Sequence, residues 1–349
     1  MEPEKGIKMR DKNSLYIIAE TAYSFEGDAT YLLSQTQNLS EKIDAIKYHV
    51  LFDINEYMDS NHSVYPLLKS WIIKKDEWIN IFKSAKKKGH DVIVLTDDRE
   101  SVGFLCENSE LVDGIEVHAA CINDKALLDD AIIFSNKYNK PLYVGISGFE
   151  IDELFVLIDY IKAKQCHNLV LMYGFQNYPT RIEDVGLAKI PYLSKLFDLP
   201  VGYADHTGYD ENEKEHLIST AYTLGANIQE IHYVLNEGEK RTDYITAVSS
   251  DRLEKIRELL INTEISIGRC DFRLNAGEKK YLNFRKVAAY SKDMKEGHVI
   301  EEADINFIRI ENPSVQHKFL EENLYVGKRL NKCVKKGEEI KNIDFECKR

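Results

Sequence analysis

Val201-Gly-Tyr-Ala-Asp205-His206-Thr207 and Ile228-Gln-Glu230-Ile-His232-Tyr-Val-Leu235 are two short apolar stretches that each carry a histidine near the end. A segment of helical periodicity, residues 212–225, separates them, so together they predict one strand–helix–strand unit. Parallel strands lying side by side would bring His206 and His232 to the same edge of a sheet. Paired imidazoles suit Mn, Fe, Zn or Ni, and carboxylate ligands would favour Mn or Mg, so the pair indicates a metal site. The alternative is two unrelated histidines, one at the surface and one in the core.

Strand-like and helix-like segments alternate along the first 235 residues. The predicted strands are residues 15–19, 43–49, 91–96, 114–119, 142–147, 169–173, 200–204 and 228–234. This alternation implies right-handed crossovers and a parallel sheet. Eight such units predict an α/β protein with a (β/α)8 TIM barrel in residues 1–263. A doubly wound open sheet is the alternative.

Polar side chains recur where the predicted strands end. In a TIM barrel the active site is built from the carboxyl ends of the strands, so these positions are candidate functional residues. They are Glu20, Lys47, His49, Thr96, Asp97, Glu116, His118, Gln176, Tyr178, Asp205, His206, Glu230 and His232. A barrel that served only as a scaffold would not need titratable groups gathered at one rim, so the pattern favours an enzyme.

The composition is that of a soluble globular protein, with 44% hydrophobic and 30% charged residues in a chain of 349. The net charge of -12 argues against nucleic acid or an anionic membrane surface as the main partner. No apolar run reaches membrane-spanning length, and the charged N-terminus lacks the apolar centre of a signal peptide. Six scattered cysteines without a CxxC pair predict reduced thiols in a cytoplasmic protein.

The strand–helix alternation ends near residue 264. Residues 264–285 are polar and predict a linker, and residues 286–349 predict a small β-rich domain. Within it, Met294-Lys-Glu-Gly297-His-Val-Ile300 and Val334-Lys-Lys-Gly337-Glu-Glu-Ile340 form a near-repeat. Each glycine is expected in the left-handed region, in a turn that leads into a strand. So small a domain has little core of its own, and we expect it either to pack on another surface or to be only a stabilising appendix.

Taken together, the motifs at the strand ends resemble those of a known enzyme family. Ile18-Ala-Glu20 and Ala45-Ile-Lys47-Tyr-His49 come first, and Asn177-Tyr178-Pro-Thr180 follows in the middle of the chain. Asp205-His206-Thr207 and Glu230-Ile-His232 then end the two histidine-bearing strands. In kind and order these motifs are similar to those of the sialic acid synthases, which include the N-acetylneuraminate, legionaminic and pseudaminic acid synthases. The C-terminal segment resembles the antifreeze-like SAF domain that closes those proteins.

The resemblance implies a specific reaction. The enol carbon of phosphoenolpyruvate attacks the aldehyde of an open-chain N-acetylated amino sugar, water adds, and phosphate leaves to give a nonulosonic acid. A divalent metal, usually Mn with Mg as another candidate, is held by His206 and His232 and polarises the aldehyde. By the same resemblance Glu20, Lys47 and Glu230 are catalytic. Glu20 would hold the sugar hydroxyls or relay a proton, and Lys47 would face the carboxylate or phosphate.

The resemblance also implies a substrate-binding set, which is His49, Thr96, Gln176, Tyr178, Asp205, Asp243 and Arg309. Arg309 matches the arginine of a Lys-Arg-Pro-Gly motif in the family's SAF domain. It would act in a domain-swapped homodimer, where the C-terminal domain of one subunit caps the barrel of the other. The arginine would then lie over the N-acetyl group of the sugar.

The chain departs from the family pattern on the side that binds phosphoenolpyruvate. The departures are Glu116 for a phosphate-binding lysine, Ala119, Gly145 and Ala204 for serines, Cys121 for an acid and Gln176 for an asparagine. Each lost charge-assisted hydrogen bond costs roughly 1.5–3 kcal/mol, and a micromolar complex is worth only about 8 kcal/mol. Several such losses together are large enough to erase a micromolar affinity, so the family's way of binding phosphoenolpyruvate cannot be assumed for this chain.

Three hypotheses follow from this mixture of kept and lost motifs. The first is a divergent synthase with a rebuilt phosphate site. The second is a non-catalytic homologue that binds a sugar or a partner protein. The third is a barrel lyase or aldolase that keeps the metal but uses another small keto acid. Phosphate release from phosphoenolpyruvate, tested with Mn and N-acetylated hexosamines, separates the first hypothesis from the others.

Overall fold

The computed structural model describes residues 14–268, 270–314 and 318–346. The chain divides after Gly268 into two compact units, which are described separately below. The first residues of the chain, on which the signal-peptide expectation rests, and Cys347 lie outside the described part. The other five cysteines are free thiols. No described helix is long and apolar enough to cross a membrane.

The first unit is built on a closed barrel of parallel strands. They are β1 (Tyr16–Glu20), β2 (Ala45–Val50), β3 (Asp91–Thr96), β4 (Gly114–Val117), β5 (Leu142–Gly145), β6 (Leu169–Gly174), β7 (Val201–Asp205) and β8 (Ile228–His232). Each strand pairs with the next, and β8 pairs with β1, for example Glu20 opposite His232. The predicted (β/α)8 barrel is therefore confirmed, and the open sheet is excluded.

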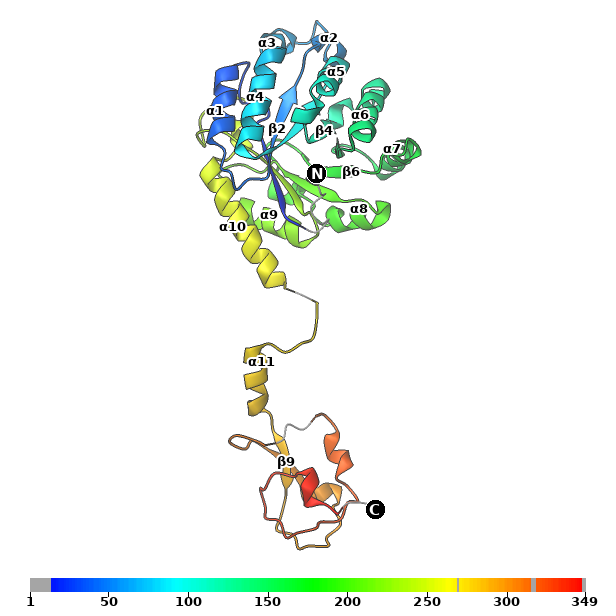
Figure 1. Ribbon diagram of the computed structural model, residues 1–349, viewed down its shortest axis with the longest axis vertical. Helices are drawn as coiled ribbons and strands as arrows, with labels where there is room; N and C mark the ends of the chain where they lie inside the picture. Colours follow the sequence, from blue (N-terminus) through cyan, green and yellow to red (C-terminus); the bar gives the residue numbers. More distant parts are fainter. Residues whose placement is uncertain (1–13, 269, 315–317, 347–349) are drawn as a thin grey trace, which may run out of the picture. The chain divides into compact units, whose positions relative to one another are not determined.

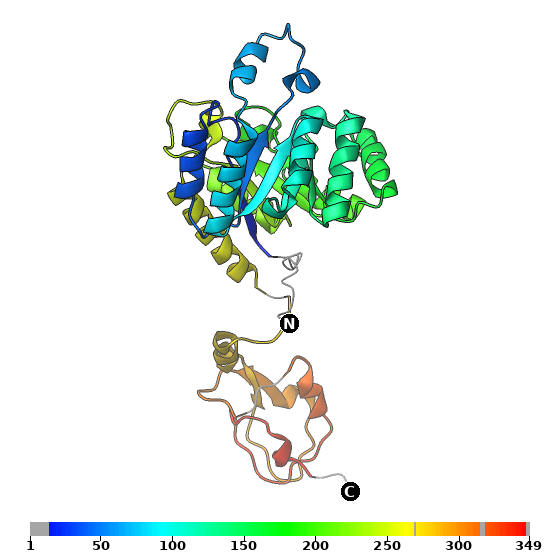
Figure 2. The same ribbon diagram turned by 45° about the horizontal axis from the view of Figure 1, so that its top comes forward.

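Helices cover the outer face of the barrel (Figure 1). The main ones are α1 (Ala29–Asn38), α4 (Lys75–Lys88), α5 (Arg99–Glu107), α6 (Lys125–Tyr138), α7 (Ile151–Ala163), α8 (Lys189–Phe197), α9 (Lys214–Thr223) and α10 (Ser250–Ile267). Two short helices, α2 (Ile54–Tyr57) and α3 (Tyr65–Ser70), lie in the connection from β2 to α4 and stand out from the barrel (Figure 2). Helix α10 continues to Ile267, so the polar stretch predicted as a linker from residue 264 begins inside a helix.

Local sequence sets the helix ends in ordinary ways. The Asp28 carboxylate accepts hydrogen bonds from the backbone N–H groups of Thr30 and Tyr31, which caps the N-terminus of α1. Helix α4 ends at Gly89, whose φ of 88° is accessible to glycine at little cost. Caps of this kind place the helices so that their apolar faces pack on the outside of the barrel.

Every second residue of each strand points into the barrel, because successive side chains alternate between the two faces. Towards the amino ends of the strands these inward positions are apolar and form a packed layer. Its buried members are Ile18, Ala45, Ile93, Tyr143, Val170, Met172 and Ala204. Towards the carboxyl ends the inward residues become polar and titratable, and this change places the candidate site.

The second unit holds a small antiparallel sheet of β9 (Val287–Tyr290) and β10 (Ile305–Ile308) around a compact core. A short helix, α11 (Ala276–Tyr281), precedes the sheet and lies within the predicted linker. The near-repeat is paired in space, because Met294 and Val334 exchange backbone hydrogen bonds of 3.0 and 2.9 Å. Gly297 and Gly337 have φ values of 84° and 83°, as predicted for the two turns.

Candidate active site

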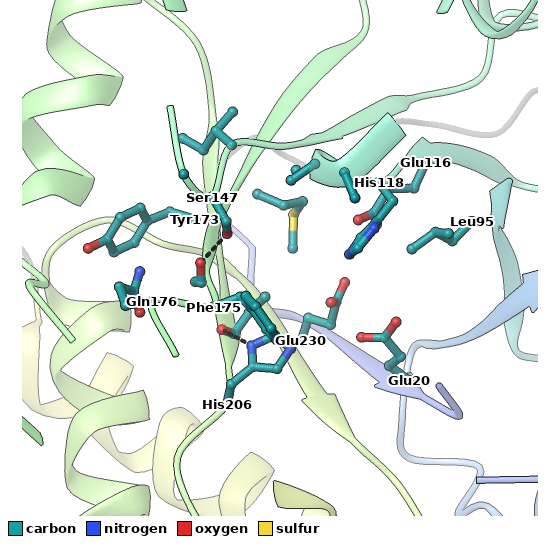
Figure 3. Close-up of a pocket in the computed structure, with 18 of the residues that line it drawn as sticks. Glu20, Leu95, Glu116, His118, Ser147, Tyr173, Phe175, Gln176, His206 and Glu230 are labelled. Carbon is teal, nitrogen blue, oxygen red and sulfur yellow. Dashed lines mark hydrogen bonds between the residues drawn. The ribbon is translucent and has the colours of Figure 1, made fainter. Parts of the chain in front are cut away.

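A cavity of about 1150 Å³ opens at the carboxyl ends of the strands. Inward-facing residues from all eight strands, or from the positions just after them, line the cavity: Glu20, Lys47, His49, Leu95, Glu116, His118, Gly145, Met172, Gly174, Ala204, His206, Glu230 and His232. Figure 3 shows Glu116 and His118 on one wall and His206 on another, with Glu230 between them. Because these residues come from many strands, the closed barrel is what brings them together.

Glu20, His206 and His232 form the group best suited to hold a metal ion. Their ligand atoms all lie within 4.8 Å of one another, and all three side chains are buried. The Nε2 atom of His232 is 3.4 Å from a carboxylate oxygen of Glu20. The ring centroids of the two histidines are 4.7 Å apart. One carboxylate and two imidazoles are a donor set that suits Mn or a similar divalent cation.

Hydrogen bonds to the other ring nitrogens orient both imidazoles toward this group. Nδ1 of His206 donates to the carbonyl oxygen of Ala204 at 3.0 Å, so Nε2 carries the free lone pair. Nδ1 of His232 lies 3.0 Å from Oγ1 of Thr246. Burial, and then the nearby His232, lower the pKa of His206 to about 3, so its ring is neutral and able to ligate at physiological pH. The residues present therefore fit a divalent cation.

Lys47 lies deeper in the barrel and is surrounded by three carboxylates. Its Nζ atom is 2.7 Å from Glu230, 2.9 Å from Glu116 and 3.2 Å from Glu20. Only 2% of the lysine side chain is exposed. An ammonium group has three N–H donors, and these three contacts use all of them. Lys47 therefore has no donor left for a substrate carboxylate or phosphate.

The three carboxylates around Lys47 differ in how readily they ionise. Burial, and then the charge of Glu20, keep the pKa of Glu230 well above its ordinary value. Burial also raises the pKa of Glu116, although Lys47 opposes the effect. Burial opposes ionisation of Glu20 too, but Lys47 and His232 outweigh it and bring the pKa of Glu20 well below its ordinary value. The ionised carboxylate thus faces the two histidines.

A loop after β8 supplies another wall of the cavity. Asp243 lines it in the left-handed region, with a φ of 63°, which is uncommon for a residue other than glycine. Its carbonyl oxygen accepts from the Tyr178 hydroxyl at 2.7 Å, and its carboxylate accepts from the Tyr23 N–H at 3.2 Å. Asp243 and Tyr178 are therefore held together at the rim.

A second histidine–carboxylate group lies at the ends of β2, β3 and β4. Nε2 of His49 is in direct contact with the carboxylate of Asp97, whose side chain is fully buried. Cys121 Sγ donates to the other Asp97 oxygen at 3.3 Å, and the Tyr23 hydroxyl is 3.4 Å from the oxygen that contacts His49. Burial disfavours a charge on His49, but Asp97 outweighs it and raises the pKa of the imidazole. Asp97 therefore favours the protonated form of the imidazole on this side of the cavity.

The wall where the family pattern places phosphate-binding hydroxyls is closed by backbone. A Cβ atom added to Gly145 would lie 2.9 Å from the backbone nitrogen of Ala119, closer than real Cβ contacts come. The short turn that begins at Ala119 thus packs directly on the end of β5. Ala204 and Met172 continue this wall without a hydrogen-bond donor in their side chains. A serine, which the family pattern has at position 145, would therefore not fit here, because the Ala119 backbone occupies the space of its side chain.

We predict that Gly145→Ser lowers the free energy of unfolding by about 1–3 kcal/mol, because the new side chain must displace the Ala119 backbone. Denaturant unfolding measures the change. Gly103→Ser is the matched control, since nothing lies within 4 Å of a Cβ at that position in α5. The control should stay within about 0.5 kcal/mol of the wild type. Equal stability of the two variants would contradict the closed wall.

The structure gathers most of the predicted site residues in one cavity but leaves three elsewhere. Its lining includes Glu20, Lys47, His49, Gln176, Tyr178, His206, Glu230, His232 and Asp243. Thr96 and Asp205 point away from the barrel interior, because they alternate with inward-facing neighbours. Arg309 lies in the second unit, exposed, with its guanidinium 5.1 Å above the Phe284 ring. Its action in a dimer stays a prediction.

A substrate-binding role does not fit the positions of Asp205 and Thr96. The Asp205 carboxylate contacts the buried Nζ of Lys214 and accepts from the hydroxyls of Tyr203 and Thr207. The Thr96 hydroxyl donates to the carbonyl oxygen of Glu116 at 3.3 Å. Both side chains therefore stabilise the barrel from its outer face.

Asp97 is among the strand-end candidates identified from the sequence, but the substrate-binding set implied by the resemblance leaves it out and includes Thr96 instead. Strand alternation alone would have favoured Asp97 over Thr96. Asp97 lies two residues after the inward-facing Leu95 and so shares its face, whereas Thr96 lies between them and faces outward. His118 likewise follows the inward-facing Glu116 by two residues. The contact between Asp97 and His49 joins residues of adjacent strands, and spacing along the chain does not reveal it.

Comparisons with known proteins agree with the motifs. The family model described as "NeuB family" matches residues 26–271. The pseudaminic acid synthase of Campylobacter jejuni serotype O:2 is 26% identical over 348 residues, which cover 95% of this chain and 97% of that protein. The N,N'-diacetyllegionaminic acid synthase of Legionella pneumophila is 23% identical over 333 residues, which cover 87% of this chain and 88% of that protein.

A solved structure shows that the likeness extends to the complete fold. The putative spore coat polysaccharide biosynthesis protein E of Chromobacterium violaceum superposes with a TM-score of 0.81 at 15% sequence identity. The superposition covers 96% of this chain and 100% of that structure. Both units of this chain therefore have counterparts in one solved protein.

Proposed function

Because the chain belongs to the NeuB family, we propose that it is a metal-assisted synthase that joins phosphoenolpyruvate to the aldehyde of an open-chain N-acetylated amino sugar. The observation that carries this proposal is the group Glu20, His206 and His232, whose ligand atoms lie within 4.8 Å at the carboxyl end of the barrel. A divalent cation held there, with Mn²⁺ as the first candidate, supplies Lewis acidity to a carbonyl oxygen. The products are a nonulosonic acid and inorganic phosphate.

The surrounding side chains have clear tasks in this reaction. C3 of phosphoenolpyruvate bonds to the aldehyde carbon, and the aldehyde oxygen gains a proton and becomes a hydroxyl. Burial raises the pKa of Glu230, so this cavity-lining carboxyl can give the proton, while the ionised Glu20 can hold the metal or a sugar hydroxyl. Water then adds at C2, and the C–O bond to phosphate breaks. Tyr178, Gln176 and Asp243 also line the cavity, with groups that can hydrogen-bond sugar hydroxyls.

A second candidate function is favoured by the state of Lys47. All three of its donors are used by Glu20, Glu116 and Glu230, and the neighbouring wall is closed where Ala119 packs on Gly145. This arrangement favours a donor without a phosphate, namely a 2-oxo acid such as pyruvate. Its enol carbon would bond to the same aldehyde carbon in an aldol addition, and no phosphate would leave.

Both candidates are tested by one assay with two arms. The Mn²⁺-loaded protein is incubated with a panel of N-acetylated hexosamines and either phosphoenolpyruvate or pyruvate, and phosphate and product mass are measured. We expect sugar-dependent phosphate release in the first arm. Product in the pyruvate arm alone would replace the first candidate by the second. A metal-loaded protein that reacts in neither arm would contradict both.

A further inference from the structure

Phosphoenolpyruvate and pyruvate, the three-carbon donors of the two proposed reactions, are both anions. The cavity must therefore offer a cationic group or an N–H donor that binds the anionic end. Lys47 is the buried lysine of the cavity, but its three donors are bound to carboxylates. Lys189 also lines the cavity, and it is exposed at the start of α8 with its Nζ 5.8 Å above the Tyr173 ring. Among the described residues, the other cavity-lining side chains with N–H donors are Gln176 and four imidazoles, of which His206 and His232 belong to the metal group and His49 and His118 lie at the ends of β2 and β4.

His49 is the first of these imidazoles, and it is held in a single orientation. Its ring packs against Tyr23 with centroids 4.2 Å apart and planes tilted by 33°, and its Nε2 contacts Asp97. Asp97 accepts from Cys121 as well, so its carboxylate is fully engaged inside the protein. Only 10% of the His49 side chain is exposed, and the residue lines the cavity. Nδ1 is therefore the ring nitrogen that can meet a ligand.

His118 is the second imidazole, and its protonation pattern follows from an unpaired atom. Its Nδ1 is buried and has no hydrogen-bond partner. A buried N–H without an acceptor is costly, so the proton is better placed on Nε2. His118 also lines the cavity, and Figure 3 shows its ring pointing into it. The ring centroids of His49 and His118 are 6.1 Å apart, so two N–H donors can converge on one small anion.

We propose that His49 and His118 form the anion site of this cavity and bind the carboxylate or the phosphate of the three-carbon donor, with Asp97 as the positioning residue behind His49. This inference rests on the proposed function, because it assigns the anionic end of that donor. Below the pKa of His49 its imidazolium supplies a positive charge, His118 supplies an N–H, and Lys47 keeps its carboxylate partners. The closed wall at Ala119 and Gly145 then borders the site and limits its size.

The charged and titratable groups around His49 define how the site should respond to pH. They are Asp97, Cys121, His118, Tyr23, Tyr57, Glu20 and Lys47. Asp97 raises the pKa of His49, so the imidazolium is present below that pKa and is lost above it. Anion affinity should therefore fall as the pH rises through the pKa of His49. Asp97→Asn should move this fall to lower pH, which a purely structural role for Asp97 would not do.

Calorimetric titration of the Mn²⁺-loaded protein tests the proposal with phosphoenolpyruvate, pyruvate and inorganic phosphate as probes. We expect His49→Gln and His118→Gln each to weaken binding of phosphoenolpyruvate by roughly 10- to 100-fold, the effect of losing a charge-assisted hydrogen bond. His167→Gln is the matched control, because His167 is exposed. Weaker binding of pyruvate but not of inorganic phosphate would assign the carboxylate to the pair, and the reverse would assign the phosphate.

The outcomes separate this proposal from the proposed function. Unchanged affinity for all three probes in folded His49→Gln and His118→Gln proteins would overturn the anion site, even if the wild type releases phosphate with a sugar. So would a metal-loaded wild type that binds none of the probes. Histidine-dependent binding without sugar-dependent turnover would support the anion site and count against the synthase. Circular dichroism and thermal unfolding confirm that each variant is folded.

Discussion

His206→Ala is expected to abolish tight Mn²⁺ binding and to reduce sugar-dependent turnover by about 10³-fold. His206 supplies one of three ligand atoms that lie within 4.8 Å of one another, and Glu20 and His232 alone leave the ion largely to water. Lewis-acid stabilisation of a carbonyl is worth several kcal/mol, and about 4 kcal/mol corresponds to this factor. Metal content after dialysis and the initial rate of product formation measure the two effects.

The control for this variant is His216→Ala, because His216 is exposed on α9. It should keep the metal content and the rate of the wild type. The metal site would be in the wrong place if His206→Ala retained one tightly bound Mn²⁺ per chain. A full loss of metal with an unchanged rate would instead contradict the role given to the metal.

Lys47→Met is expected to lower the free energy of unfolding of the metal-free protein by about 3–5 kcal/mol at neutral pH. Among the described residues, Lys47 is the only direct ion-pair partner of Glu116 and of Glu230. Both carboxylates stay buried after the substitution, so water does not replace the lost partner. Without Lys47 their pKa values in the folded state rise further above those of the unfolded chain. The folded state then binds more protons, so stability should increase as the pH falls from neutral toward the pKa of an unfolded glutamate.

Denaturant unfolding at several pH values measures this effect. Lys42→Met is the control, because Lys42 also contacts a carboxylate, Glu254 at 2.6 Å, but its side chain is 58% exposed. A surface pair of this kind contributes at most about 1 kcal/mol. Equal losses for the two variants, or a loss for Lys47→Met that does not shrink at lower pH, would contradict the buried cluster around Lys47.

The barrel and the juxtaposition of His206 and His232 were predictable from the sequence because both depend on repeated local patterns. Strand and helix periodicities alternate, and each predicted strand end lies within two residues of the observed one. His206 lies just after β7 and His232 is the last residue of β8, so one strand–helix–strand unit brings them together. The family resemblance drawn from these motifs is confirmed by the match over residues 26–271.

The part of the cavity around Glu116, Ala119 and Gly145, where the resemblance places phosphoenolpyruvate, was not predictable in the same way. The resemblance implies a lysine at the position of Glu116, but only the barrel shows that Glu116 pairs with Lys47 across the interior. The approach of Ala119 to Gly145 likewise depends on how a turn packs on the next strand. Asp205 and Thr96 are errors of a different kind, since strand alternation alone would have placed them on the outer face.

The central claim is that a metal held by Glu20, His206 and His232 meets the aldehyde of an N-acetylated amino sugar. Paramagnetic relaxation tests it directly, with Mn²⁺-loaded protein and the sugar labelled with carbon-13 at every position. The strongest relaxation enhancement is expected at C1, and it should disappear in His206→Ala. Enhancement that is strongest at the far end of the sugar, or that persists in His206→Ala, would contradict the claim.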